Sequence, residues 1–530
     1  MDISDMKNIK AFTVKRISLF LLALVMTTVS CTDQFESINL DKNAIATLGP
    51  SQLAFLFSKA ESAAPNSQWN YQVAQNLFAD QYCQYFACEA TYFGSDRLVI
   101  NQGWVGAAFN PMYTDVVPQL STIFSSTDPS SAEYALANIW WVYTFHRVTD
   151  YWGPIPYFNA GISATTVAYD PQDKIYDDFF KRLSAAVDVL KNKTNETPFG
   201  NYDIIYGGDV KKWIKFANTL RLRLAMRISS VDATRAKTEA EAAVAAGTLT
   251  TSPTEDALVQ RSTKGGDGNG LAIMEWNEFR MSASMESVLK GYEDPRMHEY
   301  FMPSVKTGDY EGLRNGLTSA QLTDLSEINS ADYNSHHGAR WSPADIGGTA
   351  DYLAAPQNVM CVAEAFFLRA EGALKGWNMG SGTAESFYNE GIKQSFLQWG
   401  LTDDPNVYIN SGKLPIAPND FLNSPPMTNI PVKFGSSQAM QEEQIATQKW
   451  SALYPDGMEA WADYRRSHKL KLYPVANSDN PLITNTATQW IRRMPFLDSE
   501  KQTNAKAVYD AASLLGGDDN TQTPLWWDKN

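Results

Sequence analysis

Paired amphipathic helices constrain the fold of this chain more than any other feature. The segment KIYDDFFKRLSAAVDVLK, which begins at Lys174, carries apolar side chains three and four residues apart, and the segment 131–149 before it is also helical in pattern. A second pair joins 209–229 to the alanine-rich run 235–247, whose final glycine is an expected C-cap. Because each helix must bury its apolar face against a neighbour, the sequence predicts an all-α fold with little β structure.

In a third pair of predicted helices, small and aromatic residues are spaced as in a known helical repeat. The pair combines 358–377 with 383–400, and in the latter Ala384, Tyr388 and Gly391 follow the small-aromatic-small pattern of the second helix of a tetratricopeptide repeat. Small residues let paired helices approach closely, while large ones fill the space between pairs. We therefore expect tetratricopeptide-like helix pairs connected by long loops.

Residues inside these helices are expected to serve the fold. Trp213, Phe216 and Leu220 lie on one face of their helix, which predicts that they are buried. The acidic residues Glu364 and Glu371 share a face, and the pair Arg465 and Arg466 has acidic neighbours on a short helix. We expect the two acids to have a structural role and to bond the end of a facing helix, and we expect the two arginines to form a structural ion network.

No linker rich in Pro, Ser or Gly divides the chain into independent cores, so we expect a single domain over residues 31–530. Its long irregular stretches are typical of functional surfaces or of disorder. They are 90–105, 250–270, 303–355 and 403–435.

The N-terminus resembles a lipoprotein signal. The apolar run from Ile17 to Val29 is too short to span a bilayer core, which needs about 20 residues, and four basic residues precede it. Small residues then lead directly to Cys31, as in the lipobox of bacterial lipoproteins, whose cysteine is lipidated. We expect a signal peptide over 1–30 and a lipid on Cys31. The alternative is an ordinary signal peptide followed by a chance cysteine.

The remaining cysteines, Cys83, Cys88 and Cys361, do not suggest a disulfide framework. Cys83 and Cys88 lie in a segment that we expect to be helical, where a spacing of five residues points them roughly 140° apart. Buried free thiols are the simplest interpretation.

Charge and motif content exclude several functions. The formal net charge is −15, and no basic block follows the leader, so nucleic acid is not an expected partner. His336 and His337 are neighbours, but no metal motif accompanies them, and no G-x-S-x-G elbow is present. We expect no enzymatic activity, no metal and no cofactor. A glycosidase stays open as an alternative, because two carboxylates can converge from distant positions.

Aromatic residues in the loops indicate a binding surface. Flat rings suit the apolar faces of sugars, while nearby polar side chains bind hydroxyl groups. The alternative for each ring is that it fastens its own loop to the body. The predicted ligand-binding residues, which we expect to form a shallow platform from three loop regions, are Tyr92, Phe93, Trp276, Tyr333 and Trp341.

Several blocks, in order along the chain, resemble the SusD/RagB family of outer-membrane nutrient-binding lipoproteins. The most specific is W-x2-F-A-N-[ST]-L-[RK]-L-R, which is intact from Trp213 to Arg223. The resembling blocks are RVTDYWGPIPYFNA (147–160), GDVKKWIKFANTLRLRLAMRIS (208–229), YEDPRM (292–297), AEAFFLRAEGALKGW (363–377), QKWSALYPDGMEAWADYRRS (448–467) and PLWWD (524–528).

The resemblance implies a helical, SusD-like body anchored through Cys31 to the outer membrane and facing the cell exterior. It also implies a partner, a SusC-like TonB-dependent transporter, and an oligosaccharide cargo that the lipoprotein captures and delivers. Some relatives handle peptides, so a RagB-like peptide-binding component is the alternative. The blocks carry the fold, and the loops that bind ligand diverge, so the resemblance implies no particular binding residues.

Overall fold

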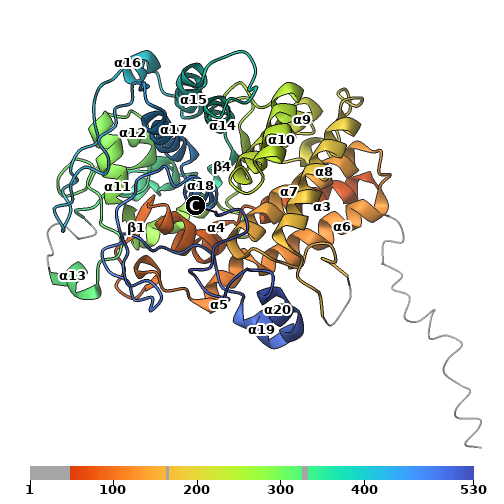
Figure 1. The fold of residues 1–530 in the computed structure, drawn as a ribbon, viewed down its shortest axis with the longest axis horizontal. Coiled ribbons are helices and arrows are strands. Elements are labelled where there is room, and N and C mark those ends of the chain that lie inside the picture. Colours follow the sequence, from red (N-terminus) through yellow and green to blue (C-terminus); the bar gives the residue numbers. More distant parts are fainter. Residues whose placement is uncertain (1–47, 163–165, 325–331, 530) are drawn as a thin grey trace, which may run out of the picture. The chain divides into compact units, whose positions relative to one another are not determined.

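The computed structural model describes residues 48–162, 166–324 and 332–529. The predicted signal peptide 1–30 and Cys31 lie outside the described residues. The chain from Pro50 onward forms one compact unit, whose elements are mostly helices (Figure 1). The predicted all-α fold with little β structure is confirmed.

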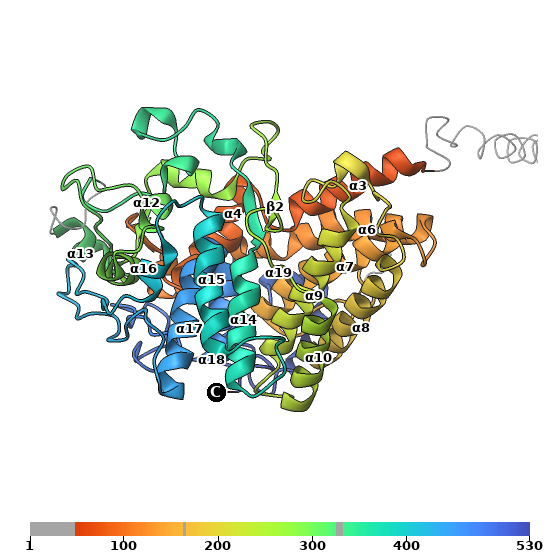
Figure 2. The same ribbon diagram turned by 90° about the horizontal axis from the view of Figure 1, so that it is seen from above.

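Helix pairs form the body of this unit, as predicted. In Figure 2 the long helices stand side by side, with α9 joining one group to the next through contacts with α8 and α14. The paired helices are α7 (Ala132–Trp152) with α8 (Gln172–Leu190), α9 (Val210–Arg227) with α10 (Ala233–Ala246), α14 (Val362–Leu374) with α15 (Ala384–Gln398), and α17 (Gln438–Leu453) with α18 (Gly457–Ser467).

Local signals begin and end these helices. The hydroxyl of Ser131 accepts a hydrogen bond from the backbone N–H of Tyr134 at 3.1 Å and so caps the start of α7. Thr383 and Ser386 form a capping box at the start of α15. Gly247 ends α10 with φ of +96°, a conformation that glycine adopts without steric cost, and this confirms the expected C-cap.

Shorter helices occupy the connections. Figure 1 shows α11, α12, α13 and α16 on the side away from α7 and α8. The bounds of the remaining helices are α3 (Pro50–Ala63), α4 (Gln68–Tyr71), α5 (Gln102–Val105), α6 (Val117–Ser126), α11 (Ala283–Met285), α12 (Met297–Tyr300), α13 (Ser319–Asp324), α16 (Pro405–Ile409), α19 (Asp498–Thr503) and α20 (Ala505–Ala512).

Two short antiparallel ribbons accompany the helices. In one, β1 (Phe86–Cys88) pairs with β3 (Phe279–Met281), with Cys88 opposite Phe279. In the other, β2 (Ala257–Val259) pairs with β4 (Gln357–Met360). Each ribbon joins segments that are far apart in sequence, so the strands fix loops against one another.

The helix predicted through Cys83 and Cys88 is wrong beyond Tyr82. A π-helical segment, Gln72–Asp80, and one further turn precede Gln84, whose φ of +57° breaks the helix. Cys88 then lies in β1, because pairing with β3 overrides the local preference. Cys83, Cys88 and Cys361 are nevertheless buried free thiols, as expected.

The helix predicted to begin at Asn358 instead begins at Val362. The residues before it form β4, and the carboxylate of Asp256 accepts a hydrogen bond from the backbone N–H of Val362 at 2.7 Å. The start of α14 is therefore set by an acid that lies distant in sequence, next to β2, which a local pattern does not show.

The predicted packing of α9 and α15 is confirmed. Trp213, Phe216 and Leu220 are each fully buried. A Cβ atom at Gly391 would lie 2.8 Å from the ring of Phe367 on α14, so glycine at this position allows α14 and α15 to approach closely. Among the described residues, no helix has both the length and the apolarity to cross a membrane.

Candidate ligand-binding site

The β1 and β3 ribbon brings two of the predicted site residues to the same end. Tyr92 follows β1 and Trp276 precedes β3, and the strands are antiparallel. Beyond the ribbon, the backbone N–H of Glu89 donates to the carbonyl of Glu278 at 2.9 Å, which extends the pairing towards both rings. Tyr92 is 68% exposed and Trp276 is 50% exposed, so both present aromatic surface to solvent.

Glu278 organises the polar side of this end. Its carboxylate accepts a hydrogen bond from the phenol of Tyr92 and another from the amide of Gln72, which follows α4. Partial burial and the contact with Glu278 raise the pKa of Tyr92 to about 12, so the phenol stays protonated at physiological pH. The exposed ring is thus held by the side chain of the residue that precedes β3.

Phe93 lies beneath this surface. It is 6% exposed, and its ring stacks on Phe279 of β3 with 5.8 Å between centroids. The ring of Tyr92 contacts one side of Phe93, and Trp104 of α5 meets it edge to face at 5.4 Å. Phe93 therefore supports exposed rings and does not itself present a face to solvent.

Two further exposed rings belong to the same region, and sequence reasoning missed them. Trp104 is 36% exposed and contacts Phe93. Trp69 is 57% exposed on α4, which packs against the 3-10 helix that ends at Trp276. The available signal was a tryptophan amid polar or small residues, in SQWNY and NQGWVG. We call Trp69, Tyr92, Trp104 and Trp276 the aromatic face.

The other two predicted residues lie elsewhere. Tyr333 is buried, and its hydroxyl accepts a hydrogen bond from the amide of Asn419. Its segment meets β3 at Met281, the end away from Trp276. Trp341 is also buried, and it meets Trp399 edge to face on the wall of a separate cavity. The structure therefore gathers Tyr92, Phe93 and Trp276, while Tyr333 and Trp341 are placed apart from them.

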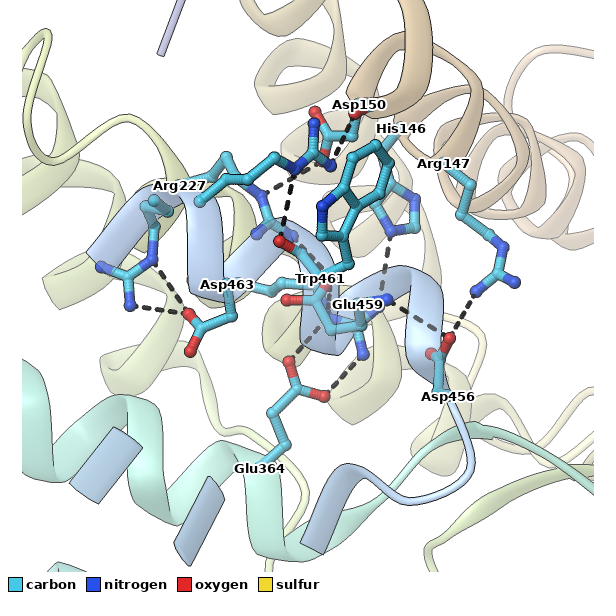
Figure 3. A network of polar contacts seen from close by, with 12 residues as sticks. His146, Arg147, Asp150, Arg227, Glu364, Asp456, Glu459, Trp461 and Asp463 are labelled. Carbon is cyan, nitrogen blue, oxygen red and sulfur yellow. Dashed lines mark hydrogen bonds and ion pairs between the residues drawn. The ribbon is translucent and has the colours of Figure 1, made fainter. Parts of the chain in front are cut away.

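A network of buried charges lies between the helix pairs (Figure 3). Arg223 of α9 forms a two-pronged ion pair with Glu364 of α14, at 2.7 and 2.5 Å. One turn further along α9, Arg227 contacts Glu459 of α18 at 2.5 Å and Asp150 of α7 at 3.1 Å. These side chains are almost completely buried, so the network ties α7, α9, α14 and α18 together.

The acids of α14 and the arginines of α18 that were expected to have structural roles are part of the same interior. Arg466 contacts Asp463 at 2.7 Å and Glu371 at 2.6 Å, which confirms the structural roles expected for Arg466 and Glu371. Burial raises the pKa of the Asp463 carboxyl, but Arg466 and Lys449 outweigh it and hold that pKa below its ordinary value. Arg465 differs from the prediction, because its guanidinium donates to backbone carbonyls and stacks on Trp461.

The blocks quoted above meet in this interior. Five of them supply network residues: Arg147 and Asp150 come from the first, Arg223 from the second, and the later blocks supply the facing acids. Trp527 of the closing PLWWD block donates its indole N–H to Asp150 at 2.8 Å. The blocks therefore specify how the helix pairs meet, and the aromatic face lies outside them.

The two adjacent histidines belong to no cluster of metal ligands among the described residues. No group of three or more His, Cys, Asp or Glu side chains there is arranged to hold a metal ion. His337 is buried with Nε2 3.1 Å from the carbonyl of Trp341, and burial lowers its pKa to about 3, so its ring is neutral. His336 also has its pKa lowered by burial, to about 4.

The body and the aromatic face together define a class of protein: a tetratricopeptide-like helical body that presents exposed rings from its loops. Residues 36–528 match the model of the SusD-like family, described as Susd and RagB outer membrane lipoprotein. The chain belongs to this family of outer-membrane lipoproteins, and the predicted resemblance is confirmed.

Solved structures agree with this assignment. A chitin-binding SusD homologue from Flavobacterium johnsoniae is 34% identical with a TM-score of 0.81, and the match covers 91% of this chain and 99% of that one. A SusD homologue from Bacteroides vulgatus is 31% identical with a TM-score of 0.79, over 90% and 98% of the two chains. One from Bacteroides thetaiotaomicron is 28% identical with a TM-score of 0.79, over 90% and 99%. The comparison with curated proteins found no match.

Proposed function

We propose that this chain is a cell-surface lipoprotein that binds an oligosaccharide and delivers it to a SusC-like TonB-dependent transporter. The observation that carries the proposal is the pair of exposed rings, Tyr92 and Trp276, at one end of the β1 and β3 ribbon. Membership of an outer-membrane lipoprotein family and similarity to a chitin-binding homologue support it.

The aromatic face suits the surface of a sugar. The axial C–H groups of a pyranose ring form an apolar patch that stacks on a flat aromatic ring. Glu278 lies beside Tyr92 and offers an acceptor for hydroxyl groups. Each stacked ring contributes about 0.5–1.5 kcal/mol beyond its buried area, which is consistent with micromolar to millimolar affinity after the costs of association.

The remaining parts of the proposal concern location and partner. A lipid on Cys31 would hold the protein on the outer membrane, with the binding surface facing the exterior. The protein would bind without chemical conversion of its ligand and without a cofactor. In support, Glu364 and Glu459 of the network are paired with arginines and are buried.

Calorimetry against an oligosaccharide panel that includes chito-, cello- and malto-oligosaccharides tests the proposal. We expect Tyr92→Ala and Trp276→Ala each to weaken binding by about ten-fold, which corresponds to about 1.4 kcal/mol. Tyr509→Ala is the matched control, because Tyr509 is 81% exposed on α20 and lies outside the aromatic face. Binding that survives both changes unaltered would contradict the assignment of the site.

Phe93, Tyr333 and Trp341 complete the predicted site and belong in the same series. All three are buried, so their replacement by alanine is expected to lower the thermal midpoint. A loss of affinity at an unchanged midpoint would show instead that the ligand reaches them.

Two outcomes would replace the proposal. Sustained release of products from a glycan, abolished by a single Asp or Glu substitution, would indicate a lipid-anchored glycosidase. Binding of a peptide pool in place of every glycan would indicate a RagB-like peptide-binding component.

The delivery step is tested by co-purification from outer membranes. We expect a SusC-like transporter to co-purify with the lipoprotein, and we expect it to be missing when the lipoprotein is deleted and to return when the lipoprotein is expressed again.

A further inference from the structure

A cavity of 370 Å³ lies beside the aromatic face, and no residue of that face lines it. Its volume falls in the range of ligand-binding cavities, about 300–1,000 Å³. The floor includes Tyr71, Arg147 and Asp456, which are all buried, whereas the rim includes Thr349 and Asp351, which are exposed. A buried floor below an exposed rim makes a blind pocket that opens on one side.

Three aromatic rings, Tyr71, Trp341 and Trp399, line the pocket. Trp341 meets Trp399 edge to face with 5.8 Å between centroids. The phenol of Tyr71 donates to Asp80 at 2.7 Å, and a Cβ atom at Gly270 would lie 2.3 Å from its ring, so the backbone presses against Tyr71. These rings are held by the surrounding protein and form a preorganised apolar surface.

Each arginine of the pocket has an acidic partner. Arg147 contacts Asp456 at 3.1 Å on the floor, and both side chains are buried (Figure 3). Arg340 forms an ion pair with Glu299 and lies over the ring of Trp399, with 4.6 Å to the centroid. Because each arginine has an acidic partner and Asp351 adds a carboxylate at the rim, the pocket does not favour an anionic ligand.

Neutral polar groups on the walls lack partners. The amide oxygens of Asn358 and Gln398 and the indole N–H of Trp399 are buried without a hydrogen-bond partner. These three atoms are closed to solvent, whereas the amide residues that carry two of them line the pocket and make its lining polar but uncharged. A hydroxyl group both donates and accepts, as an amide does, so the two suit each other as hydrogen-bonding partners.

We propose that this pocket binds the terminal residue of a neutral oligosaccharide, as a second subsite beside the aromatic face. The inference rests on the proposed function and adds that the protein recognises a chain end. Aromatic walls, neutral amides and paired charges match an uncharged sugar ring, and the blind floor admits an end of the chain and excludes its middle.

Calorimetry with a neutral oligosaccharide of the panel tests this subsite through pocket variants. Ala355→Phe fills the pocket from its wall, and Gln398→Ala removes a wall amide. We expect each to weaken binding by about five-fold to ten-fold. Gln438→Ala is the control, because its amide is exposed on α17 outside the pocket. Equal thermal midpoints verify that each variant is folded.

The form of the ligand provides a second test. Oligosaccharides blocked at the reducing or the non-reducing end are compared with the free chain. We expect one blocked form to lose affinity with the wild-type protein and not with Ala355→Phe. Equal binding of both blocked forms would overturn the recognition of a chain end.

The outcomes separate this inference from the proposed function. Binding weakened by Tyr92→Ala and Trp276→Ala but unchanged by both pocket variants would overturn the second subsite and leave the proposed function standing. A crystal structure with oligosaccharide on the aromatic face and only ordered water in the pocket would have the same meaning. If no glycan of the panel binds, the proposed function and the second subsite are both contradicted.

Discussion

The phenol of Tyr92 donates a hydrogen bond to the carboxylate of Glu278 across the end of the β1 and β3 ribbon. The same carboxylate accepts a hydrogen bond from Gln72, so it connects the helical body to the loop after β1. An aromatic side chain that is 68% exposed would otherwise sample several rotamers. Glu278 thus restricts a ring that has few contacts of its own.

Removing this restraint is expected to affect binding more than stability. Glu278→Ala frees the ring of Tyr92, and the ligand must then order it, which should weaken oligosaccharide binding by about two-fold to five-fold. Tyr92→Phe keeps the ring and loses only the hydrogen bond, so we expect the same direction of change. Calorimetry measures the affinity, with the exposed Glu385→Ala as the control. A gain in affinity for Glu278→Ala would show that its carboxylate hinders the ligand.

Sequence periodicity was sufficient to predict the helix pairs, because the residues that pack on one face of a helix recur every three or four positions in the sequence. The face of α9 shows this, since Trp213, Phe216 and Leu220 recur at helical spacing and are all buried. The short strands have no comparable sequence pattern. A three-residue strand such as β1 depends on pairing with β3, which lies almost two hundred residues away in the sequence, and this pairing turned an expected helix into a ribbon.

The candidate site was harder to predict, because exposure depends on what packs above a residue. Tyr92 and Trp341 both lie in loops among polar residues, yet Tyr92 is exposed and Trp341 is buried against Trp399. Trp69 was missed because its short helix has no distinctive pattern, and its position near Trp276 comes from packing between segments distant in sequence.

The buried pair of Arg223 and Glu364 is expected to matter strongly for stability. Both side chains are at most 1% exposed, so Glu364→Ala leaves a buried guanidinium without its main partner and should cost about 3–5 kcal/mol. The control is Asp510→Ala, which breaks an exposed pair with Lys506 and should cost less than about 1 kcal/mol. Chemical denaturation measures both. If both variants lose an equally small amount of stability, Glu459, which lies 3.6 Å from Arg223, fully replaces Glu364 as the partner of this arginine.

The second stability prediction concerns Trp213. Its ring is fully buried against Phe216, and its indole N–H donates to Asp203 at 2.6 Å. Trp213→Ala removes both contacts and leaves a cavity, so the free energy of unfolding should fall by about 3–5 kcal/mol. Trp276→Ala serves as a matched control, because that ring is half exposed. An unchanged thermal midpoint for Trp213→Ala would contradict the packing of α9.

The raised pKa of Asp80 predicts that stability depends on pH. Burial raises its pKa to about 7, although hydrogen bonds from Tyr71 and Gln75 oppose the shift. In the unfolded chain the pKa is about 3.9, so the folded state binds the proton more tightly. The contribution of Asp80 to stability is therefore fully present below about pH 4 and declines as the pH rises to about 7.

Asp80→Asn isolates this contribution, because it retains the shape and removes the titration. We expect the difference in unfolding free energy between the variant and the wild type to change by about 1–4 kcal/mol from pH 4 to pH 7, with the variant gaining. Denaturant unfolding at a series of pH values measures it. A difference that is constant over this range would show that Asp80 titrates alike in both states.

The last prediction concerns the anchor, and it separates location from recognition. Cys31 lies before the described residues, whereas the aromatic face and the pocket belong to the unit that begins at Pro50. Acylation of Cys31 would supply membrane affinity through buried methylene groups, about 0.8 kcal/mol for each, and Cys31→Ala removes that contribution. We expect Cys31→Ala to move from the membrane fraction to the soluble fraction while the affinity of the purified protein for oligosaccharide stays unchanged. Fractionation with membranes after mild washing would contradict the lipid anchor, and a changed affinity would mean that the N-terminal segment takes part in recognition.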